Sequence, residues 1–466
     1  MPDSASSPFD LIAIGGGPAG SHVAEGAAAA GMVVALVEAD QLGGTCLNYG
    51  CDPMNTLVEA ARALRSASTA DRFGIETGGV RVDWPSVRRR IDAMVGTIRD
   101  GDGVDDVRAK GITFARGQAR FLSEMEIEVG DEVLTADRFV IATGSEVETP
   151  EIDGIDDAGF LTHRDVFSLD ELPSSLIVLG SGGNALEFAQ TFNTLGVDVT
   201  LVTPDPVLLG REDADIVDTL TDCLERDGLR LCLDATPLAI SRDEDGIALT
   251  VESPDGSEMV LEANDVLVAT ERVPRVADLS LDAAGVAWSA KGVQVTSGLR
   301  TTAPHIWAAG DVTGIYAFTH VAHYQAEIAL HNILHPNAPR RADYRVVPWK
   351  VFTHPELARV GLTEAEARAG AWDVVTSMMD LRDLPRPMTL GEREGLVKLV
   401  VDRSTRQILG GHVLGEHASD VIQQVALAME QRLPVTAIAD TLHVHPSMSE
   451  AVSWAAQNVR DELARE

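Results

Sequence analysis

The chain has 466 residues, of which 45% are hydrophobic, so it can form two or three domains with buried cores and is not a disordered acidic chain. It contains 72 Asp and Glu against 37 Lys and Arg, a formal net charge of −35, which argues against nucleic acid or an anionic membrane as a partner. An acidic surface with only four lysines is typical of proteins adapted to a salt-rich cytoplasm, although an ordinary acidic protein is the alternative.

The N-terminus and the hydropathy pattern predict where the protein resides. Residues 1–9 lack the charged and apolar regions of a signal peptide. No stretch of the chain reaches the roughly 18 apolar residues that a membrane helix needs. We therefore expect a cytoplasmic protein with no membrane partner.

The first elements form a nucleotide-binding pattern. Residues 9–14 are a predicted strand, a glycine-rich turn follows at residues 15–20, a helix extends to about residue 30, and a second strand at 33–37 ends at Glu38. This is the order of a dinucleotide-binding βαβ unit. Its glycines Gly15, Gly17 and Gly20 let the backbone approach a pyrophosphate at the helix N-terminus. Glu38 can accept hydrogen bonds from a ribose.

Two cysteines follow, Cys46 and Cys51, ahead of a predicted helix at residues 55–68. An ideal helix separates residues five apart by about 7.5 Å along its axis, whereas a disulfide needs Cα atoms closer than about 7 Å. The backbone between the two cysteines must therefore depart from a helix, which Gly50 and Pro53 permit. A strained pair at a helix start is easily reduced. A structural disulfide or two unrelated core cysteines are the alternatives.

A second nucleotide-binding pattern begins after predicted helices at 55–68 and 82–99, strands within 111–130 and a strand at 139–144. It consists of a strand at 176–179, a turn with Gly180 and Gly182, a helix at 187–195 and a strand at 199–202. Two such units suggest two nucleotides, although one unit could be a decayed duplicate. The strand at 199–202 is followed by Thr203, where an acid would bind the ribose of NADH.

The C-terminal part of the chain has a different pattern. Short strands are predicted at 266–270 and 306–311. After residue 341, hairpin-like strands at 396–401 and 408–414 precede helices at 420–431 and 447–460. We expect a third domain of the α+β type. The remaining cysteines, Cys223 and Cys232, are expected to be inert buried thiols.

Taken together, G-G-T-C-L-N-Y-G-C at 43–51, the two glycine turns, A-T-G at 142–144, A-A-G-D at 308–311 and H-P-S-M-S-E at 445–450 resemble the class I pyridine nucleotide–disulfide oxidoreductases. This family includes glutathione reductase, dihydrolipoamide dehydrogenase and mercuric reductase. The resemblance implies an α/β fold with two Rossmann-like three-layer domains and an α+β dimerisation domain. It assigns residues 1–150 and 273–342 to FAD, 151–272 to the nicotinamide nucleotide and 343–466 to dimerisation.

The resemblance also implies an electron path from the nicotinamide nucleotide through FAD to a Cys46–Cys51 disulfide and then to a small-molecule disulfide. Cys51 is expected to lie against the flavin as the charge-transfer thiolate, and Cys46 to attack the substrate. His445 matches the acid–base residue, which suits an imidazole near neutral pH, and Glu450 matches the carboxylate that orients it. In a homodimer, His445 completes the other subunit's site. The alternative is that His445 only caps a turn.

The remaining residues that the resemblance assigns to cofactor binding lie in the glycine turns and at scattered loop and strand positions. They are Gly15, Gly17, Gly20, Glu38, Thr45, Cys46, Asn55, Ala119, Thr143, Gly144, Asp311, Thr319, Gly180, Gly182, Glu187, Thr203, Arg211 and Arg272. No metal site is expected.

Several positions depart from the family pattern. Asn55 stands where the family has a lysine paired with a glutamate near the flavin, here Glu187. Glu271 replaces a glycine in the nicotinamide-side signature A-T-E-R at 269–272. Thr203 favours NADPH over NADH, although NADH is possible, and Arg211 is the nearest candidate for a 2′-phosphate contact.

Three substrates can be weighed against the sequence. Mercuric reductase resembles the chain around residues 199–213, but it uses a C-terminal cysteine pair, and this chain has no cysteine after Cys232. Dihydrolipoamide dehydrogenase has the same H-P-S ending but needs NAD⁺. The halophile-like composition favours a bis-γ-glutamylcystine reductase like those of haloarchaea, with selectivity in the loop at 380–394, which contains Arg382, Arg386 and Arg393. A flavin-binding relic without turnover is the non-enzymatic alternative.

Overall fold

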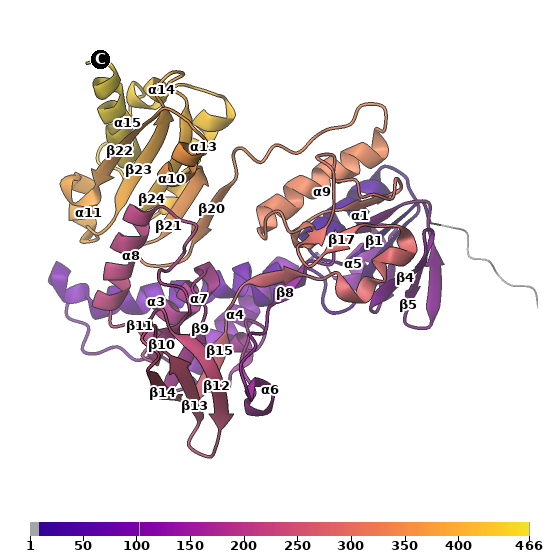
Figure 1. Ribbon diagram of the computed structural model, residues 1–466, viewed down its shortest axis with the longest axis horizontal. Coiled ribbons are helices and arrows are strands. Elements are labelled where there is room, and N and C mark those ends of the chain that lie inside the picture. Colours follow the sequence, from indigo (N-terminus) through magenta and orange to yellow (C-terminus); the bar gives the residue numbers. More distant parts are fainter. Residues whose placement is uncertain (1–8, 102, 466) are drawn as a thin grey trace, which may run out of the picture. The chain divides into compact units, whose positions relative to one another are not determined.

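The computed structural model of the chain describes residues 9–101 and 103–465 (Figure 1). They form two compact units. The first contains residues 9–56, 85–101, 103–148 and 271–343, and the second contains residues 57–84, 149–270 and 344–465. The signal-peptide prediction concerns residues 1–9 and lies almost wholly outside the described residues.

A five-stranded parallel sheet forms the centre of the first unit (Figure 1). Side chains along β1 alternate between its faces: Leu11 and Ala13 pack with helices α1 and α9, while Ile12 and Ile14 pack with the antiparallel strands β4, β5 and β6. The predicted three-layer nucleotide-binding fold is confirmed for this unit. In spatial order the sheet is β19 (Ile306–Ala308), β7 (Phe139–Ile141), β1 (Leu11–Ile14), β2 (Val34–Glu38) and β3 (Thr113–Arg116).

The other elements of the first unit surround this sheet or connect to it. Its helices include α1 (Pro18–Ala29), α2 (Gly44–Tyr49), most of α4 (Trp84–Arg99), α5 (Val104–Ala109) and α9 (Thr319–Leu334). Its antiparallel strands are β4 (Ala119–Ser123), β5 (Glu126–Val129) and β6 (Glu132–Thr135), with a small β17 (Trp288–Ser289) and β18 (Gly292–Val293) pair.

Two antiparallel strands mark where the chain leaves the first unit and returns to it. These are β8 (Ser145–Val147) and β16 (Arg272–Pro274), and their register places Arg272 opposite Val147. The segment between them therefore begins and ends at neighbouring positions.

A four-stranded parallel sheet begins the second unit. Its strands are fully apolar where they are buried, and helix α7 packs against β9 and β10. A three-stranded antiparallel sheet, which the sequence patterns did not predict, follows. The parallel sheet is ordered β11 (Arg230–Cys232), β10 (Asp198–Val202), β9 (Ser175–Leu179) and β15 (Asp265–Val268). The antiparallel sheet contains β12 (Thr236–Arg242), β13 (Ile247–Glu252) and β14 (Glu258–Ala263). The helices are α6 (Ile155–Ala158), α7 (Gly183–Thr194) and α8 (Ala214–Arg226).

The C-terminal part of the second unit is a five-stranded antiparallel sheet covered by helices, as predicted for an α+β domain. Helix α15 packs against β22 and β23, and its buried face includes Ala451, Val452 and Ala455. The sheet is ordered β20 (Pro348–Val351), β21 (Leu357–Gly361), β24 (Ile408–Leu414), β23 (Leu396–Asp402) and β22 (Val374–Asp380). The helices are α10 (Glu364–Ala369), α11 (Pro385–Leu390), α12 (Ala418–Val421), α13 (Gln423–Glu430), α14 (Val435–Ala439) and α15 (Glu450–Leu463).

A buried ion cluster links α8 to this antiparallel sheet. Lys398 on β23 is 4% exposed, and its Nζ lies 2.9 Å from Asp213 Oδ1, 2.6 Å from Asp215 Oδ2 and 2.9 Å from Glu364 Oε2. The carboxylates come from the start of α8 and from α10. The cluster compensates a lysine that would otherwise be too costly to bury.

Several helix boundaries differ from the predictions. Helix α3 (Cys51–Ser68) and helix α7 each begin four residues earlier than predicted, and the predicted helix at 420–431 is divided into α12 and α13. Pro53 lies in the first turn of α3, where proline is tolerated because its missing N–H has no helical partner. Because glycine and proline are usually found in loops, the glycines and the proline near the starts of α3 and α7 made the predicted starts too late.

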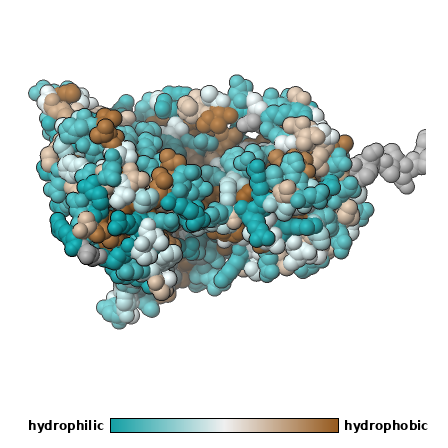
Figure 2. All heavy atoms as spheres, turned by 90° about the horizontal axis from the view of Figure 1, so that it is seen from above, coloured by the Kyte–Doolittle hydropathy of each residue, from teal (hydrophilic) through white to brown (hydrophobic). Residues whose placement is uncertain are grey.

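The surface agrees with the acidic composition. Figure 2 shows hydrophilic side chains over most of the face drawn, with hydrophobic residues scattered or in small groups. Among the described residues, no helix combines the length and apolar character needed to cross a bilayer.

Candidate active site

The two cysteines lie on consecutive helices of different length. Cys46 is inside the short helix α2, and Cys51 is the first residue of α3. Gly50 separates the helices with φ −127° and ψ −116°, and a Cβ at this position would lie 2.9 Å from the Thr45 carbonyl oxygen. The predicted departure from helical geometry is therefore present, at the glycine. Both cysteines are free thiols, Cys46 half-buried and Cys51 exposed.

The two thiols differ in acidity. Although Cys51 is exposed, neighbouring groups partly desolvate its sulfur. Hydrogen bonding from Cys46, helped by Thr319, outweighs this desolvation and lowers the pKa of Cys51 to about 7. The same hydrogen bond, together with burial, raises the pKa of Cys46 above its ordinary value. Thr319 Oγ1, at the start of α9, lies 3.7 Å from Cys51 Sγ. The pair can therefore hold one negative charge on Cys51 near neutral pH while Cys46 keeps its proton.

The first glycine turn has the geometry that a pyrophosphate requires. A Cβ at Gly15 would lie 2.2 Å from the Ala142 oxygen, and one at Gly20 would lie 1.8 Å from the Gly15 oxygen, so no side chain fits at either position. Gly17 caps α1 without a side-chain hydrogen bond, which leaves the first amides of this helix for an anion. These residues fit FAD.

Glu38 occupies the predicted position at the end of β2, but it also holds the turn. Its Oε2 accepts the Gly16 amide at 2.6 Å, and its Oε1 accepts the Asp40 amide at 2.7 Å. A carboxylate has about four acceptor positions, so Glu38 can accept further hydrogen bonds from a ribose.

Asp311 belongs to a chain of hydrogen bonds that the sequence patterns did not indicate. Ser145 Oγ donates to Asp311 Oδ2 at 2.6 Å, and Arg272 donates from Nε to Ser145 Oγ at 2.9 Å and from Nη2 to the Ser145 oxygen at 2.7 Å. Arg272 therefore lies on β16 in the first unit and holds Ser145, which follows the A-T-G motif directly. The position of Ser145 beside that motif was the available signal.

The other predicted residues of the first unit make mostly local contacts. Thr143 Oγ1 donates to the Arg275 oxygen at 2.8 Å, and Gly144 has a left-handed φ of +72°. Asn55 Nδ2 donates to the Cys51 oxygen at 2.9 Å, so its amide bonds its own helix. Ala119 is buried at the start of β4, and Thr45 is half-buried on α2.

The second glycine turn lies in the second unit. Gly180 has φ +134°, and a Cβ there would lie 2.5 Å from the Ala269 oxygen, while Gly182 caps α7 without a side-chain hydrogen bond. Thr203 is buried, and Asp205 accepts Ser181 Oγ of the turn at 2.5 Å. An acidic residue, Asp205, is thus present at this turn, two residues after Thr203, the position at which NADH-binding proteins carry an acid.

Glu187 and Arg211 also lie in the second unit. Glu187 is a buried residue of α7, and its Oε1 accepts the Phe352 amide at 2.9 Å. Arg211 is exposed, and its backbone oxygen accepts a hydrogen bond from Arg359.

His445 and Glu450 form a hydrogen-bonded pair at the start of α15. His445 Nδ1 lies 2.9 Å from Glu450 Oε1, and Glu450 Oε2 accepts the Ser447 amide at 2.9 Å. Burial opposes the charge on Glu450, but these two hydrogen bonds hold the pKa of Glu450 below its ordinary value. The His445 side chain is 64% exposed, and the preceding Leu442 and Val444 are 98% and 78% exposed. Among the described residues, no partner is found for the other ring nitrogen of His445.

No cluster of three or more histidine, cysteine or acidic side chains within residues 9–101 and 103–465 has the arrangement of a metal site.

The fold and the thiol pair define a flavin- and nicotinamide-dependent oxidoreductase. The chain belongs to the pyridine nucleotide-disulphide oxidoreductases. Residues 9–326 match the sequence model of that family, and residues 347–456 match the model of its dimerisation domain. Members of this family are enzymes that use FAD with NAD(P)H as the electron donor. The predicted family, fold class and cofactor class are confirmed.

The relatives belong to several branches of the family. A mercuric reductase of Staphylococcus aureus is 35% identical over 449 residues, 96% of this chain and 82% of the relative. A dihydrolipoyl dehydrogenase of Chlamydia trachomatis is 35% identical over 462 residues, 96% of this chain and 95% of the relative. A solved Cu(II) complex of the HOCl-induced flavoprotein disulfide reductase RclA from Escherichia coli has a TM-score of 0.87 and 31% identity, covering 97% of this chain and 100% of that chain. These similarities do not select one substrate.

Proposed function

We propose that this protein is a cytoplasmic, NADPH-dependent reductase that converts bis-γ-glutamylcystine to γ-glutamylcysteine. The observation that supports a disulfide substrate is a pair of free thiols on either side of Gly50, Cys46 in α2 and Cys51 at the start of α3, with the pKa of Cys51 lowered to about 7 and that of Cys46 raised. FAD, when bound, carries two electrons from the nicotinamide nucleotide to this pair. We assign residues 1–150 and 273–342 to FAD binding, 151–272 to the nicotinamide nucleotide and 343–466 to dimerisation.

The cysteines and His445 share the exchange reaction. Cys46 loses its proton to His445, and its thiolate attacks one sulfur of the substrate disulfide, which gives a mixed disulfide and one thiolate product. His445 returns the proton to that product. The Cys51 thiolate then attacks the Cys46 sulfur, which releases the second product thiolate, protonated from solvent, and forms the Cys46–Cys51 disulfide. Two electrons pass from the cysteine pair to the substrate.

We propose that His445 acts in a homodimer, in the site of the partner subunit. The exposed Leu442 and Val444 beside it support this assignment, because large apolar side chains on a loop are stabilised when a second chain covers them. Glu450 orients His445 through Nδ1 and leaves Nε2 toward the sulfur chemistry.

The choice of substrate rests on charge and on the loop at 380–394. Bis-γ-glutamylcystine carries four carboxylates, and this loop contains three arginines. Arg382 is engaged by Asp380, with contacts of 2.6–3.0 Å, and Arg393 donates to the Arg382 oxygen at 3.2 Å. We assign carboxylate recognition to Arg386 and Arg393. The halophile-like composition supports a substrate of this kind.

Steady-state NADPH oxidation by the FAD-loaded protein in concentrated salt tests the proposal. The acceptors are bis-γ-glutamylcystine, glutathione disulfide, cystine, lipoamide, mercuric ion and cupric ion. We expect the highest kcat/KM with bis-γ-glutamylcystine. If bis-γ-glutamylcystine is turned over no better than glutathione disulfide or cystine, the proposed substrate is rejected. Activity confined to lipoamide or mercuric ion assigns the protein to the branch of those relatives.

A spectroscopic measurement separates an enzyme from a flavin-binding relic. Two-electron reduction of the loaded protein is expected to produce a long-wavelength absorption band that Cys51→Ser removes. A protein with neither this band nor turnover of any acceptor binds flavin without catalysis.

A further inference from the structure

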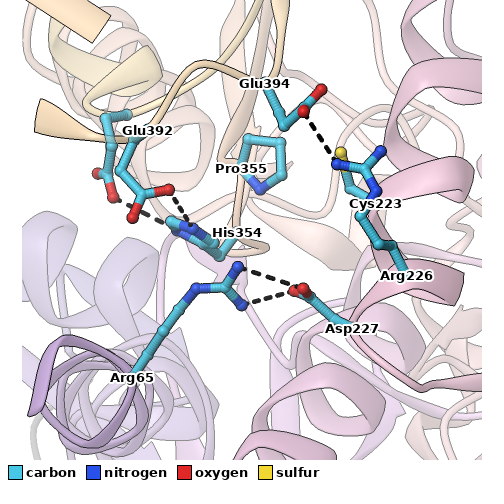
Figure 3. A pocket seen from close by; sticks show the side chains of 9 residues that line it. Arg65, Cys223, Arg226, Asp227, His354, Pro355, Glu392 and Glu394 are labelled. Carbon is cyan, nitrogen blue, oxygen red and sulfur yellow. Dashed lines mark hydrogen bonds and ion pairs between the residues drawn. The ribbon is translucent and has the colours of Figure 1, made fainter. Parts of the chain in front are cut away.

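A small polar pocket in the second unit lies where α3, α8 and three loops meet (Figure 3). It offers about 30 Å³ to a solvent molecule, which is enough for water but not for a substrate. Its interest lies in the charged side chains that line it. They are Arg65, Arg226, Asp227, His354, Glu392, Glu394 and Glu416, together with Cys223 and Pro355.

His354 lies between two carboxylates. Its Nε2 is 3.1 Å from Glu392 Oε2 (Figure 3). Its Nδ1 is 3.3 Å from Glu416 Oε1. A neutral imidazole has one N–H and one lone pair, so it can donate to only one of these carboxylates and must turn its lone pair toward the other. Only the imidazolium donates to both. Two carboxylates facing the two ring nitrogens therefore favour the protonated ring.

The backbone of His354 is held in place, so the ring is the fixed partner. The His354 amide donates to Gln190 Oε1 at 2.7 Å, and Gln190 Nε2 donates to the His354 oxygen at 2.6 Å. Gln190 is buried on α7. When the proton is lost, a carboxylate must move rather than the ring.

Glu392 is the carboxylate that can leave. Its side chain is 31% exposed, against 19% for Glu416, and it lies in a loop rather than at the end of a core strand. The hydrogen bond from His354 lowers the pKa of Glu416 to about 2, and Arg62 and His417 also favour its charge. We therefore expect a neutral ring to keep its one N–H on Nδ1, toward Glu416, and to give up the 3.1 Å hydrogen bond to Glu392.

The other charged groups around the pocket are mostly paired with one another. Arg65 Nη1 lies 2.5 Å from Asp227 Oδ2, and Arg226 Nη1 lies 3.0 Å from Glu394 Oε1. Burial and Arg65 oppose the charge on His354, but Glu392 and Glu416 outweigh them and raise the pKa of His354 above its ordinary value. Burial also raises the pKa of the Cys223 thiol to about 11, so this thiol is neutral beside the pocket.

We propose that His354 is a positioning residue: its protonated ring holds the end of the loop at 381–394 through Glu392, and loss of the proton releases that end. The loop comprises residues Leu381–Asp383, helix α11 and the segment up to Glu394. Glu394 ties the same loop to Arg226, but that ion pair does not depend on a group that titrates near neutral pH. Leu381 and Leu384 anchor the start of the loop in the core, so the end of the loop, at residues 391–394, is the part held by one proton-dependent and one proton-independent ion pair.

Hydrogen–deuterium exchange of the FAD-loaded protein in concentrated salt tests the proposal. Exchange of peptides covering residues 385–395 is measured from pH 6 to pH 9 and corrected for the intrinsic rate. We expect exchange about tenfold faster at high pH, because one hydrogen bond between charged groups is lost. The change should occur above pH ~6.5, the ordinary value for histidine.

Two variants with amides in place of carboxylates distinguish a proton-operated contact from a merely structural one. In Glu416→Gln, the amide donates to Nδ1 while a neutral ring donates from Nε2 to Glu392, so the loop should stay protected at both pH values. In Glu392→Gln, the amide donates to Nε2 while a neutral ring donates from Nδ1 to Glu416, so the pH step should also be lost. This variant replaces the first one if Glu416→Gln fails to fold. Glu394→Gln is the control, with faster exchange at both pH values and the step preserved. A missing step in the unaltered protein, or an unchanged step in both amide variants, overturns the proposal.

The consequence for catalysis rests on the proposed function. If Arg386 and Arg393 bind the substrate, KM for bis-γ-glutamylcystine should rise across the same pH range while kcat changes less, and Glu416→Gln should abolish the rise. An exchange step without a KM step leaves the inference about His354 standing and removes this loop from substrate binding.

Discussion

Nδ1 of His445 lies 2.9 Å from Oε1 of Glu450, and the second oxygen of the same carboxylate accepts the Ser447 amide. One residue therefore fixes both the ring tautomer and the turn that carries the ring. Glu450→Gln keeps the shape but removes the charge that stabilises the imidazolium. We expect kcat to fall by roughly 10²–10⁴-fold, the range for a lost acid–base contribution.

Steady-state kinetics and flavin content together check this expectation, since the bound FAD should be unchanged. Glu462→Gln is the control, because Glu462 lies at the other end of α15 and pairs only with Arg403 at 3.4 Å. Equal activity of the two variants would contradict the assigned role of Glu450.

The hydroxyl of Thr319 helps to hold the negative charge on Cys51. In Thr319→Val that contact is lost, so the neutral thiol is favoured and the pKa of Cys51 rises above about 7. The rate of alkylation of the reduced protein at pH 7 should fall roughly fivefold to tenfold, because a pKa change of about one corresponds to a tenfold change in thiolate. Thr56→Val is the control, since its hydroxyl donates to the Asp52 oxygen. The prediction is contradicted if the alkylation rate depends on pH in the same way in Thr319→Val as in the unaltered protein.

Asp205 accepts Ser181 Oγ of the second glycine turn. A carboxylate at this turn repels a 2′-phosphate and can bind the ribose diol of NADH, so Asp205 weakens the NADPH preference that we propose. Asp205→Asn should therefore raise kcat/KM for NADPH, by roughly tenfold, and lower it for NADH. Asp198→Asn, at the start of β10 and paired with Arg230, should leave the ratio unchanged. The measurement is the ratio of kcat/KM for NADPH to kcat/KM for NADH. The same ratio in Asp205→Asn as in the unaltered protein would contradict the role of Asp205.

Lys398 compensates the charges of Asp213, Asp215 and Glu364. Lys398→Met leaves these carboxylates without their cation, which should cost about 3–5 kcal/mol of unfolding free energy. Urea unfolding measures the loss, and Lys291→Met, an exposed lysine-to-methionine change, should cost little. Burial opposes the charge on Asp213, but Lys398 lowers the pKa of Asp213 and, directly, that of Glu364. The stabilisation by the Lys398 ion pairs is therefore present above the ordinary carboxylate pKa and is lost as pH falls. This loss of stability in acid should be smaller in Lys398→Met.

The parts of the fold that repeat with a fixed period could be predicted from the sequence. The apolar strands, the two glycine turns and the C-terminal helices gave the architecture, and the break between Cys46 and Cys51 followed from helix geometry alone. Boundaries were less predictable, because Pro53 reads as a loop residue yet lies inside α3. The short helix around Cys46 has too few residues to show a period.

The contacts that could not be predicted join residues far apart in the chain. Arg272 was assigned to the nicotinamide side by its motif, but pairing of β16 with β8 brings it to Ser145. Asp205 reaches the glycine turn only because of the bend after β10. His354 belongs to no motif named above, and its two carboxylates come from two other segments of the chain. Such meetings depend on tertiary packing, which local patterns do not encode.

The pairing of β8 with β16 has a consequence for how this protein could diversify. Because Val147 and Arg272 are neighbours, everything between them is attached through two adjacent crossing points. Insertions are best tolerated where their ends lie close together. The segment between them can thus change in sequence while Ser145 and Arg272 keep the hydrogen bonds that reach Asp311, provided that Asp213 and Asp215 keep their ion pairs with Lys398.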